Sequence, residues 1–256
     1  MFKPSKHLNL IHAAFALLLV SSFSCQNSSY QSQKVESQTI YLDDSFKEDQ
    51  SVVDFIAPIK DSIDIQMNQI IGYAARTLDK NLPEGLLTNF VSDLILEESR
   101  AVCQNNDKKL PQPDMALMNH KGLRTIIEEG PVTVNNIFQL MPFENEIVLV
   151  TLNREQTIEF LDYIASEGGD GIAGATFTIK NGKASNIKIN GQPLSRENYV
   201  VATSDYLSKG GDHYDVFKKG TVTETKVKLR DMIIDHIKKL EANNQKIDAK
   251  LDNRIK

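Results

Sequence analysis

The sequence predicts one mixed α/β domain in which helices and strands alternate along the chain. Leu86, Phe90 and Leu94 recur at the i, i+4 and i+8 positions that form one face of a helix. Residues 147–152 are instead an unbroken apolar run, which is typical of a strand buried on both faces. Asn181-Gly182 separates two segments of strand character and strongly indicates a β-hairpin. A chain of 256 residues, 41% of them hydrophobic and 25% charged, can bury the core that such a domain needs.

The first residues are expected to direct export and not to belong to the fold. Lys3 and Lys6 make the start basic, and the apolar run 11–20 is too short to span a bilayer. Small residues and Cys25 end this run, an arrangement that resembles a bacterial lipoprotein signal over residues 1–24 with Cys25 as the lipidated residue. The alternative is an ordinary secretory signal in which Cys25 has no role. We expect a protein anchored by lipid in the bacterial cell envelope, on the periplasmic or outer-membrane face.

Residues 25–47 are polar, rich in Ser and Gln, and without periodicity, so they are predicted to be a flexible tether before a domain over residues 48–256. Cys103 is the only cysteine besides Cys25 and has no disulfide partner if Cys25 carries lipid, so we expect an inert, partly buried thiol. The formal charge of −5 makes nucleic acid an unfavourable partner.

The elements of the domain follow from apolar spacing and turn residues. Helices are predicted over residues 51–67, 84–103, 154–166 and 224–242, with a shorter helix capped by Thr133 and ending at Leu140. Strands are predicted over residues 69–78, 115–118, 147–152, 176–180 and 184–189, with another that begins at Val200. Pro83 suits the first turn of a helix, residues 168–174 are predicted to be a glycine-rich loop, and Ile158 is expected to face the core.

The functional prediction centres on residues 200–214. This segment begins as a β-branched strand and breaks at Gly210-Gly211, so that Tyr206 and Asp212 stand six residues apart around the turn. A strand fixes the position of such a turn, and glycines let the backbone approach a ligand closely. The pattern indicates a small-molecule pocket, although Asp212 could also simply cap a turn.

Three residues elsewhere fit the same pocket. Asn119 and Arg124 follow the 115–118 strand, and an arginine there offers a planar fork for phosphate or ribose oxygens. The alternative for Arg124 is a surface ion pair. Phe143 follows Pro142 at the exit of a helix, where a ring can also serve as part of the core. Two rings, a carboxylate and an Asn/Arg pair together would form a nucleoside or nucleotide site.

No catalytic residue and no metal site are predicted in this chain. Outside the export signal the histidines are His120, His213 and His236, and no two of them have metal-ligand spacing. The adjacent side chains of Asp212 and His213 are expected to point to opposite sides of an extended segment. No serine lies in a nucleophile elbow, and the 168–174 loop does not have the strand and helix context of a phosphate-binding loop.

These segments bring out a resemblance to a known family. From about residue 81 to the C-terminus, the sequence resembles the C-terminal, substrate-recognition domain of bacterial and animal 5'-nucleotidases. Five segments match in the family's order: Glu84, Asn89 and Asp93 of its E-x-N-x-G-N-x-x-x-D helix start, Asn119 to Arg124 of its N-x-G-G-x-R loop, the Pro142-Phe143 turn, Tyr206 to Asp212 of its aromatic-Leu-x-x-Gly-Gly-Asp segment, and the Arg254-Ile255 ending.

The resemblance implies a role for each matching residue of the pocket. Phe143 and Tyr206 would sandwich the nucleobase, and Asp212 would bind ribose hydroxyls. Arg124 and Asn119 would contact phosphate, ribose or the base edge.

The sequence also departs from the family pattern. His120-Lys121 replaces small glycines and is expected to crowd its loop, and Tyr206 replaces the usual Phe but still stacks. Leu86 and Thr88 replace the Asn and Gly of the helix start, and Leu82-Pro83 stands where the family often carries an arginine. These departures bear most on phosphate affinity.

Family members carry an upstream metallophosphatase domain with a two-metal site, and none of its D-x-H or G-N-H-[DE] segments occurs here. The resemblance therefore implies the recognition half of a split 5'-nucleotidase. A separate metallophosphatase chain would supply the divalent metals, with no cofactor in this chain and no hydrolysis by it alone. One alternative is a stand-alone envelope lipoprotein that binds nucleosides or another small ligand. Another is a degenerate domain without a ligand, if the His120-Lys121 loop blocks the pocket.

Overall fold

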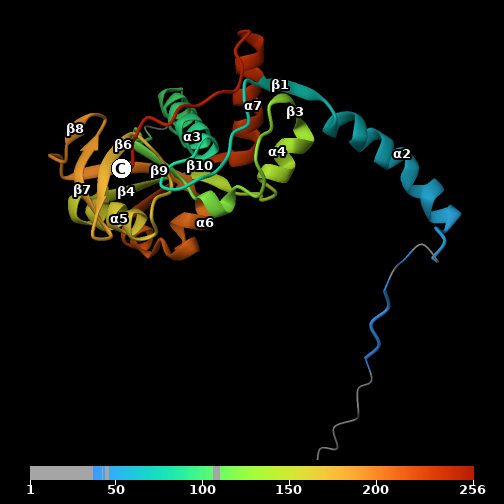
Figure 1. Cartoon of the computed structure of the whole chain (residues 1–256), viewed down its shortest axis with the longest axis horizontal. Helices are drawn as coiled ribbons and strands as arrows, with labels where there is room; N and C mark the ends of the chain where they lie inside the picture. The colour runs from blue at the N-terminus through green and yellow to red at the C-terminus, as the bar shows by residue number, and fades with distance from the viewer. Residues whose placement is uncertain (1–36, 42, 44–45, 106–109) are drawn as a thin grey trace, which may run out of the picture. The chain divides into compact units, whose positions relative to one another are not determined.

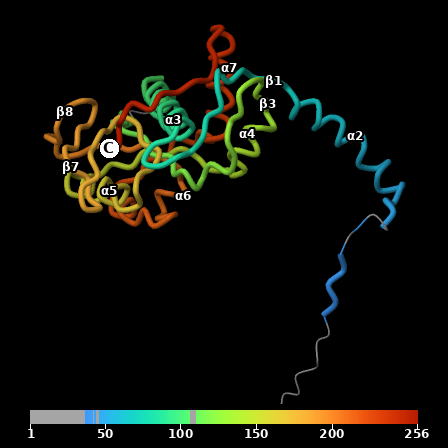
Figure 2. Tube along the Cα trace, viewed as in Figure 1, coloured from blue at the N-terminus to red at the C-terminus, as the bar shows by residue number. Residues whose placement is uncertain are grey.

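The structure, a computed structural model, describes residues 37–256 except 42, 44–45 and 106–109 (Figures 1 and 2). The predicted signal peptide, Cys25 and most of the predicted tether lie outside the described residues. Contacts group Ser51–Lys256 as one compact unit. Its first helix, α2 (Gln50–Met67), has no buried residue. Within the described ranges, no helix combines the length and the apolar character needed to cross a bilayer.

A five-stranded sheet in the order β10-β4-β9-β2-β5 forms the centre of this unit. Strand β2 runs parallel to β9, and the other neighbouring pairs are antiparallel, so the sheet is mixed as predicted. The strands are β2 (Met115–Met118), β4 (Glu146–Asn153), β5 (Gly171–Ala173), β9 (Asn198–Ser204) and β10 (Thr221–Lys228).

Helices cover both faces of the sheet, which explains why its inner strands are apolar without interruption. Successive side chains of a strand point to opposite faces: Leu149 packs into one cluster with α3 (Leu86–Gln104) and α7 (Leu229–Ala242), whereas Val148 and Val150 pack into a second cluster with α5 (Arg154–Ser166). Figure 1 shows α3 and α7 on one side of the central strands and α5 on the other.

Two smaller sheets complete the fold. One pairs β1 (Ile70–Ala74) with β3 (Gly130–Thr133), and the other has the order β6-β7-β8, with β6 (Ala175–Lys180), β7 (Lys183–Ile189) and β8 (Gln192–Pro193). The turn Asn181-Gly182 joins β6 and β7 with both residues at positive φ, which confirms the predicted hairpin. Thr133 caps α4 (Val134–Leu140), also as predicted. Cys103 is a buried free thiol whose pKa is raised by that burial.

Several predicted boundaries are wrong. The helix predicted from residue 224 begins at Leu229, because the preceding residues pair with β4 as the edge strand β10. The helix predicted from residue 84 begins at Leu86, so Pro83 lies before it. Residues 168–174 are not only a loop, since β5 pairs there with β2. Ile158 is exposed, and α5 packs through Phe160, Leu161, Ile164 and Ala165 instead.

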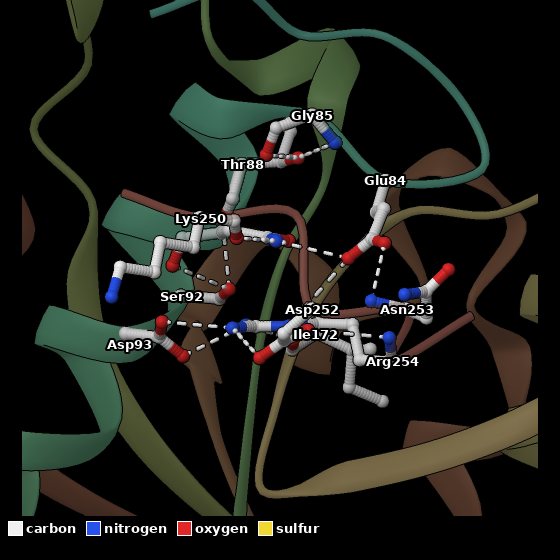
Figure 3. Close-up of polar contacts among 11 residues, drawn as sticks. Glu84, Gly85, Thr88, Ser92, Asp93, Ile172, Lys250, Asp252, Asn253 and Arg254 are labelled. Carbon is white, nitrogen blue, oxygen red and sulfur yellow. Dashed lines mark hydrogen bonds and ion pairs between the residues drawn. The ribbon is translucent and has the colours of Figure 1, made fainter. Parts of the chain in front are cut away.

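The end of the chain is held against α3 by ion pairs and hydrogen bonds of the buried Arg254 (Figure 3). The Arg254 side chain is only 8% exposed and bonds both Asp93 oxygens at 2.8 and 3.0 Å. It also donates to both oxygens of Asp252 and to the carbonyl of Ile172. Burial lowers the pKa of Arg254, but the hydrogen bonds that it donates to Asp252 and Asp93 outweigh this and raise the pKa above its ordinary value.

The buried Glu84 adds to these contacts. It accepts hydrogen bonds from the Asn253 backbone at 2.8 Å and from the Asn89 side chain at 3.0 Å. The helix-start residues and the Arg254-Ile255 ending therefore belong to one structural cluster, which we call the C-terminal clasp (Glu84, Asn89, Asp93, Asp252 and Arg254).

We predict that Arg254→Ala destabilises the fold by about 1.5–3 kcal/mol, because it removes the charge-assisted hydrogen bonds to the half-exposed Asp93 and Asp252 carboxylates and leaves the Ile172 carbonyl without its partner. Chemical denaturation followed by circular dichroism measures this loss. Arg76→Ala is the matched control, since Arg76 forms an exposed ion pair with Asp248 at 2.9 Å that is worth about 0–1 kcal/mol. Equal losses in the two variants would show that the clasp contributes no more than a surface pair.

Candidate functional site

Five strand ends meet at one edge of the central sheet. Ile147 lies opposite Ser204 and Lys228 opposite Glu146, while Gly171 lies opposite Met118. Because β2 runs parallel to β9, their carboxyl ends share this edge with the start of β4, the start of β5 and the end of β10. The loops that follow or precede these ends are therefore held close together.

These loops enclose a cavity of about 330 Å³. All five residues predicted from sequence to bind substrate line it: Asn119, Arg124, Phe143, Tyr206 and Asp212. Their roles in binding stay a prediction, but their meeting at one cavity is a property of the fold. The His120-Lys121 loop leaves this cavity open, so the expected crowding does not fill it.

Asp212 is the polar centre of the cavity. One carboxylate oxygen accepts a hydrogen bond from Asn119 Nδ2 at 2.6 Å, and the other accepts one from the Tyr206 hydroxyl at 2.9 Å. The Tyr163 hydroxyl donates to the Asp212 carbonyl at 2.7 Å. Burial, and then the charge of Glu167, raise the pKa of Tyr163, so this hydroxyl remains a donor at neutral pH. Contacts to side chain and backbone thus fix the orientation of the carboxylate.

Phe143 and Tyr206 supply aromatic surface that the core does not cover. Phe143 is 38% exposed and Tyr206 is 47% exposed, so neither ring is part of the core. The Arg124 guanidinium lies over the Phe143 ring at 5.7 Å from its centre, within cation–π distance. Within the described residues Arg124 has no ion pair, so the surface-pair alternative is not realised there.

The turn that carries Phe143 is held by Arg230 of α7. This buried guanidinium donates to the carbonyls of Met141 and Phe143, each at 3.3 Å, and forms an ion pair with Glu144. It also stacks over Phe138 at 4.0 Å from the ring centre. These contacts fix the direction in which the Phe143 ring leaves the turn. No sequence pattern identified Arg230, because its partners are mostly backbone carbonyls.

The loop with Asn119 and Arg124 is also constrained on both sides. Its middle, His120–Gly122, is a 3-10 turn. Gly122 is required by space, because a Cβ there would lie 2.6 Å from Asn119 Oδ1. On the buried side, Asp170 accepts hydrogen bonds from the His120 backbone at 2.6 Å and from the Tyr214 hydroxyl at 2.6 Å. His120 therefore points away from the cavity.

One expectation for the Gly210-Gly211 segment is wrong, and one of its glycines has a structural reason. A Cβ on Gly211 would overlap the Tyr206 ring, so this glycine is required for the close approach of Tyr206. Asp212 and His213 are not extended, since their φ angles are 48° and 63°. A short helix, α6 (Asp205–Ser208), also separates the strand from the glycines.

Several residues that line the cavity were not singled out from the sequence as binding residues: Met118, Lys121, Gly122, Met141, Asn145, Ser204 and Leu229. Among them, Asn145 is held by a hydrogen bond that its amide donates to Asp205 at 2.9 Å. Burial raises the pKa of Asp205, but hydrogen bonds from Lys209 and Asn145 lower it overall, so this acceptor stays ionised. The only sign in the sequence that Asn145 belongs to the cavity is its position two residues after Phe143.

A different group of residues has metal-ligand geometry away from this cavity. Ligand atoms of Glu97, Glu98 and His236 lie within 4.8 Å of one another, which the spacing of histidines did not predict. Both Glu98 oxygens already have partners, His236 Nδ1 at 2.9 Å and Lys239 Nζ at 2.6 Å. The arrangement is that of a hydrogen-bonded contact between α3 and α7.

Comparison with known proteins agrees with the geometry. The family model for the 5'-nucleotidase C-terminal domain matches residues 66–219, which include every residue of the cavity except Leu229. The chain belongs to the 5'-nucleotidase C-terminal domain family. This confirms the resemblance stated above and the fold class predicted from it.

The named proteins to which this chain is similar are considerably longer than this chain. A 5'-nucleotidase of Vibrio vulnificus is 27% identical over 187 residues, which is 70% of this chain and 32% of the relative. Protein UshA of Escherichia coli is 31% identical over 107 residues, which is 40% of this chain and 20% of the relative. The chain thus spans about a third or less of the length of these relatives.

Solved structures show the same fold. A 5'-nucleotidase precursor from Thermus thermophilus superposes with a TM-score of 0.64 at 22% identity, covering 81% of this chain and 42% of its own. The NAD nucleotidase of Haemophilus influenzae gives a TM-score of 0.59 at 20% identity, covering 86% and 43%.

We predict that Asn119→Asp destabilises the protein by about 1–3 kcal/mol at neutral pH, because it places a second carboxylate 2.6 Å from Asp212. Repulsion raises the pKa of one carboxyl in the folded state, so the penalty grows as pH rises above the ordinary value of about 3.9 and shrinks below it. Melting temperatures between about pH 7 and pH 4 test this. Asn119→Ala removes only a donor to Asp212 and introduces no charge, so it is expected to show a weaker pH dependence, and a parallel profile for the two variants contradicts the prediction.

Proposed function

We propose that this domain is the nucleotide-recognition half of a 5'-nucleotidase, and that a separate metallophosphatase chain completes the enzyme. The observation that carries the proposal is the meeting of two exposed rings, a fixed carboxylate and an Asn/Arg pair at one cavity. The site offers aromatic side chains beside polar groups, which is the chemistry that a nucleoside requires.

Each residue has a distinct role in this proposal. Phe143 and Tyr206 stack on the nucleobase from two loops. Asp212 accepts hydrogen bonds from ribose hydroxyls: its carboxylate receives one bond on each oxygen from the protein, and a carboxylate has room for about four. Asn119 and Arg124 contact the sugar, the phosphate or the base edge. Arg230 acts indirectly, by holding the turn that carries Phe143.

The residues that line the cavity do not provide the ligands of a hydrolytic metal centre, which supports the proposal that another chain supplies it. Its lining residues include a single carboxylate, Asp212, and no histidine. A two-metal hydrolytic site needs several such ligands, and its metals would activate the attacking water. The relatives named 5'-nucleotidase carry about two thirds of their length outside the matched region, where such a centre could lie.

We also propose that Cys25 carries a lipid that anchors the chain in the bacterial cell envelope. The basic start, the short apolar run and the small residues before Cys25 support this. Cys25→Ser should then move the protein from the membrane fraction to the soluble fraction, and a variant that stays in the membrane fraction contradicts the anchor.

We predict that Phe143→Ala and Tyr206→Ala each weaken nucleoside binding by about 1–3 kcal/mol, and that the double variant abolishes it, because base–aromatic stacking has this magnitude. Titration calorimetry of the full chain with adenosine and with uridine measures the loss for two kinds of base.

Tyr73→Ala is the matched control, since this ring on β1 is exposed to a similar degree but is not part of the cavity lining. The control should bind as the parent does. Parent-like binding by both cavity variants would show that the nucleoside binds elsewhere.

We further predict that the chain alone releases no phosphate from AMP in the presence of Mn²⁺ or Mg²⁺, and that hydrolysis appears when a metallophosphatase chain from the same organism is added. A phosphate-release assay tests this, with the Phe143→Ala/Tyr206→Ala variant as the control that should not support turnover. If nucleosides bind but no such chain restores hydrolysis, the stand-alone binding protein becomes the better assignment.

A further inference from the structure

Helix α2 has an apolar face that the domain does not cover. Val52, Ile56, Ile59 and Ile63 follow one another at i+4, i+3 and i+4 spacing, which places them in one stripe along the helix. Each is between 45% and 58% exposed, and no α2 residue belongs to either cluster of buried residues in the described part of the chain. These four residues, which we call the α2 stripe, also lie before the residues 66–219 that match the family domain.

This helix needs a partner for its stripe. A single helix of 18 residues is only marginally stable in water, and most helices in proteins owe their stability to the packing of an apolar face. Pro58 lies inside α2 and has no N–H group, so the helix also lacks one internal hydrogen bond. Covering the stripe removes apolar surface from water and stabilises the helix. The α2 stripe is therefore suited to association.

The charges of α2 distinguish between the possible partners. Asp54, Asp61 and Asp64 lie on the side of the helix away from the stripe, and three aspartates against the single Lys60 give the helix a net charge of −2. Helices that lie on a membrane surface instead carry Lys and Arg on their polar face, which anionic lipids attract. The acidic face of α2 does not fit such a surface, whereas another apolar helix face fits the stripe.

The stripe is complementary to itself. Its spacing is the same when it is read from either end. If two copies of α2 run antiparallel about a twofold axis at the middle of the helix, Ile56 of one copy meets Ile59 of the other, and Val52 meets Ile63. Lys60 is beside the stripe and the aspartates are behind it, so no like charges face one another across the axis. All four residues are then covered in both copies.

We infer that the α2 stripe is a dimerisation surface on which α2 of a second copy of this chain packs in antiparallel orientation. About two heptads of contact bury less than the ~800 Å² per partner of a standard interface, so the dissociation constant should be micromolar and not lower. The proposed lipid anchor would hold both copies in one membrane and raise their effective concentration. No stripe residue lines the candidate cavity, so each copy keeps its own site.

Sedimentation velocity over protein concentrations of about 1–200 μM tests this surface. The full exported chain carries Cys25→Ser, so that no lipid drives association, and we expect it to show a monomer–dimer equilibrium. Ile56→Glu/Ile59→Glu places unpaired charges at the centre of the contact and should weaken the dimer at least about 100-fold. The domain should still unfold cooperatively in this variant, because neither residue is buried. Ile65→Glu is the matched control, since Ile65 is an exposed isoleucine on the acidic side of the same helix and its variant should dimerise as the parent does.

A charge exchange identifies the partner and its orientation. Ile56→Lys/Ile59→Lys should be monomeric alone, but a mixture with Ile56→Glu/Ile59→Glu should form heterodimers, because opposite charges then meet. This recovery also shows that the charged variants remain folded. Ile56→Glu/Ile59→Lys in a single chain pairs opposite charges in the antiparallel arrangement and like charges in a parallel one, so this variant should retain a dimer.

Several results would overturn the inference. A parent that stays monomeric over the whole concentration range has no such surface. A dimer that survives Ile56→Glu/Ile59→Glu, or that Ile65→Glu weakens equally, forms elsewhere on the molecule. A mixture of the two charged variants that stays monomeric rules out contact between two α2 helices. Binding of a monomeric parent through the stripe to phosphatidylglycerol vesicles, or to a purified metallophosphatase chain, would assign the stripe to that partner instead.

Discussion

The antiparallel register of β4 on β9 determines where the candidate site lies. The two strands pair in continuous register, from Ile147 opposite Ser204 to Asn153 opposite Asn198. Because side chains alternate along a strand, a slip of one residue would exchange the faces that pack against α3 and α5. The same register brings the start of β4, with Phe143 and Asn145 just before it, beside the end of β9, with Tyr206 just after it. Core packing and site geometry therefore depend on a single constraint.

Two carboxylates, those of Asp170 and Asp212, hold the loops at this edge of the sheet in defined positions. Asp170 joins the loop after β2 to the segment after β9, since it accepts hydrogen bonds from His120 and Tyr214. Burial raises the pKa of Tyr214, and the charge of Asp170 raises it further, so the phenol stays a donor to that carboxylate. The Asp212 carboxylate, at the cavity, likewise accepts hydrogen bonds from two side chains, those of Asn119 and Tyr206. Asn119, which donates to Asp212, directly precedes His120, whose backbone donates to Asp170, so the two carboxylates constrain the same loop.

The sequence predicted the elements better than their boundaries, and the site residues better than their contacts. Strong periodicity located α3 and α5, and Asn181-Gly182 located the hairpin. The strand β10 was missed because its half-exposed, polar residues adjoin a helix whose apolar spacing begins at Leu229. The five site residues were candidates from their residue types and local context, and the family resemblance then gave each a role in one site, since spacing alone leaves Phe143 and Asp212 unrelated. Arg230 and Asp170 went unrecognised because they act on backbone groups from distant parts of the chain, and that information is present only in the fold.

The residues of the family pattern divide into two groups with different physical tasks. Glu84, Asn89, Asp93 and Arg254 belong to the C-terminal clasp, where the buried Arg254 binds carboxylates and holds the chain end against α3. None of them lines the cavity. Asn119, Phe143, Tyr206 and Asp212 instead line the cavity, where the two rings are partly exposed. Contact of aromatic surface with water is unfavourable, and covering that surface with a ligand or another protein lowers the free energy. A nucleobase between the two rings would cover part of it, and the remainder is where a second domain could complete the site.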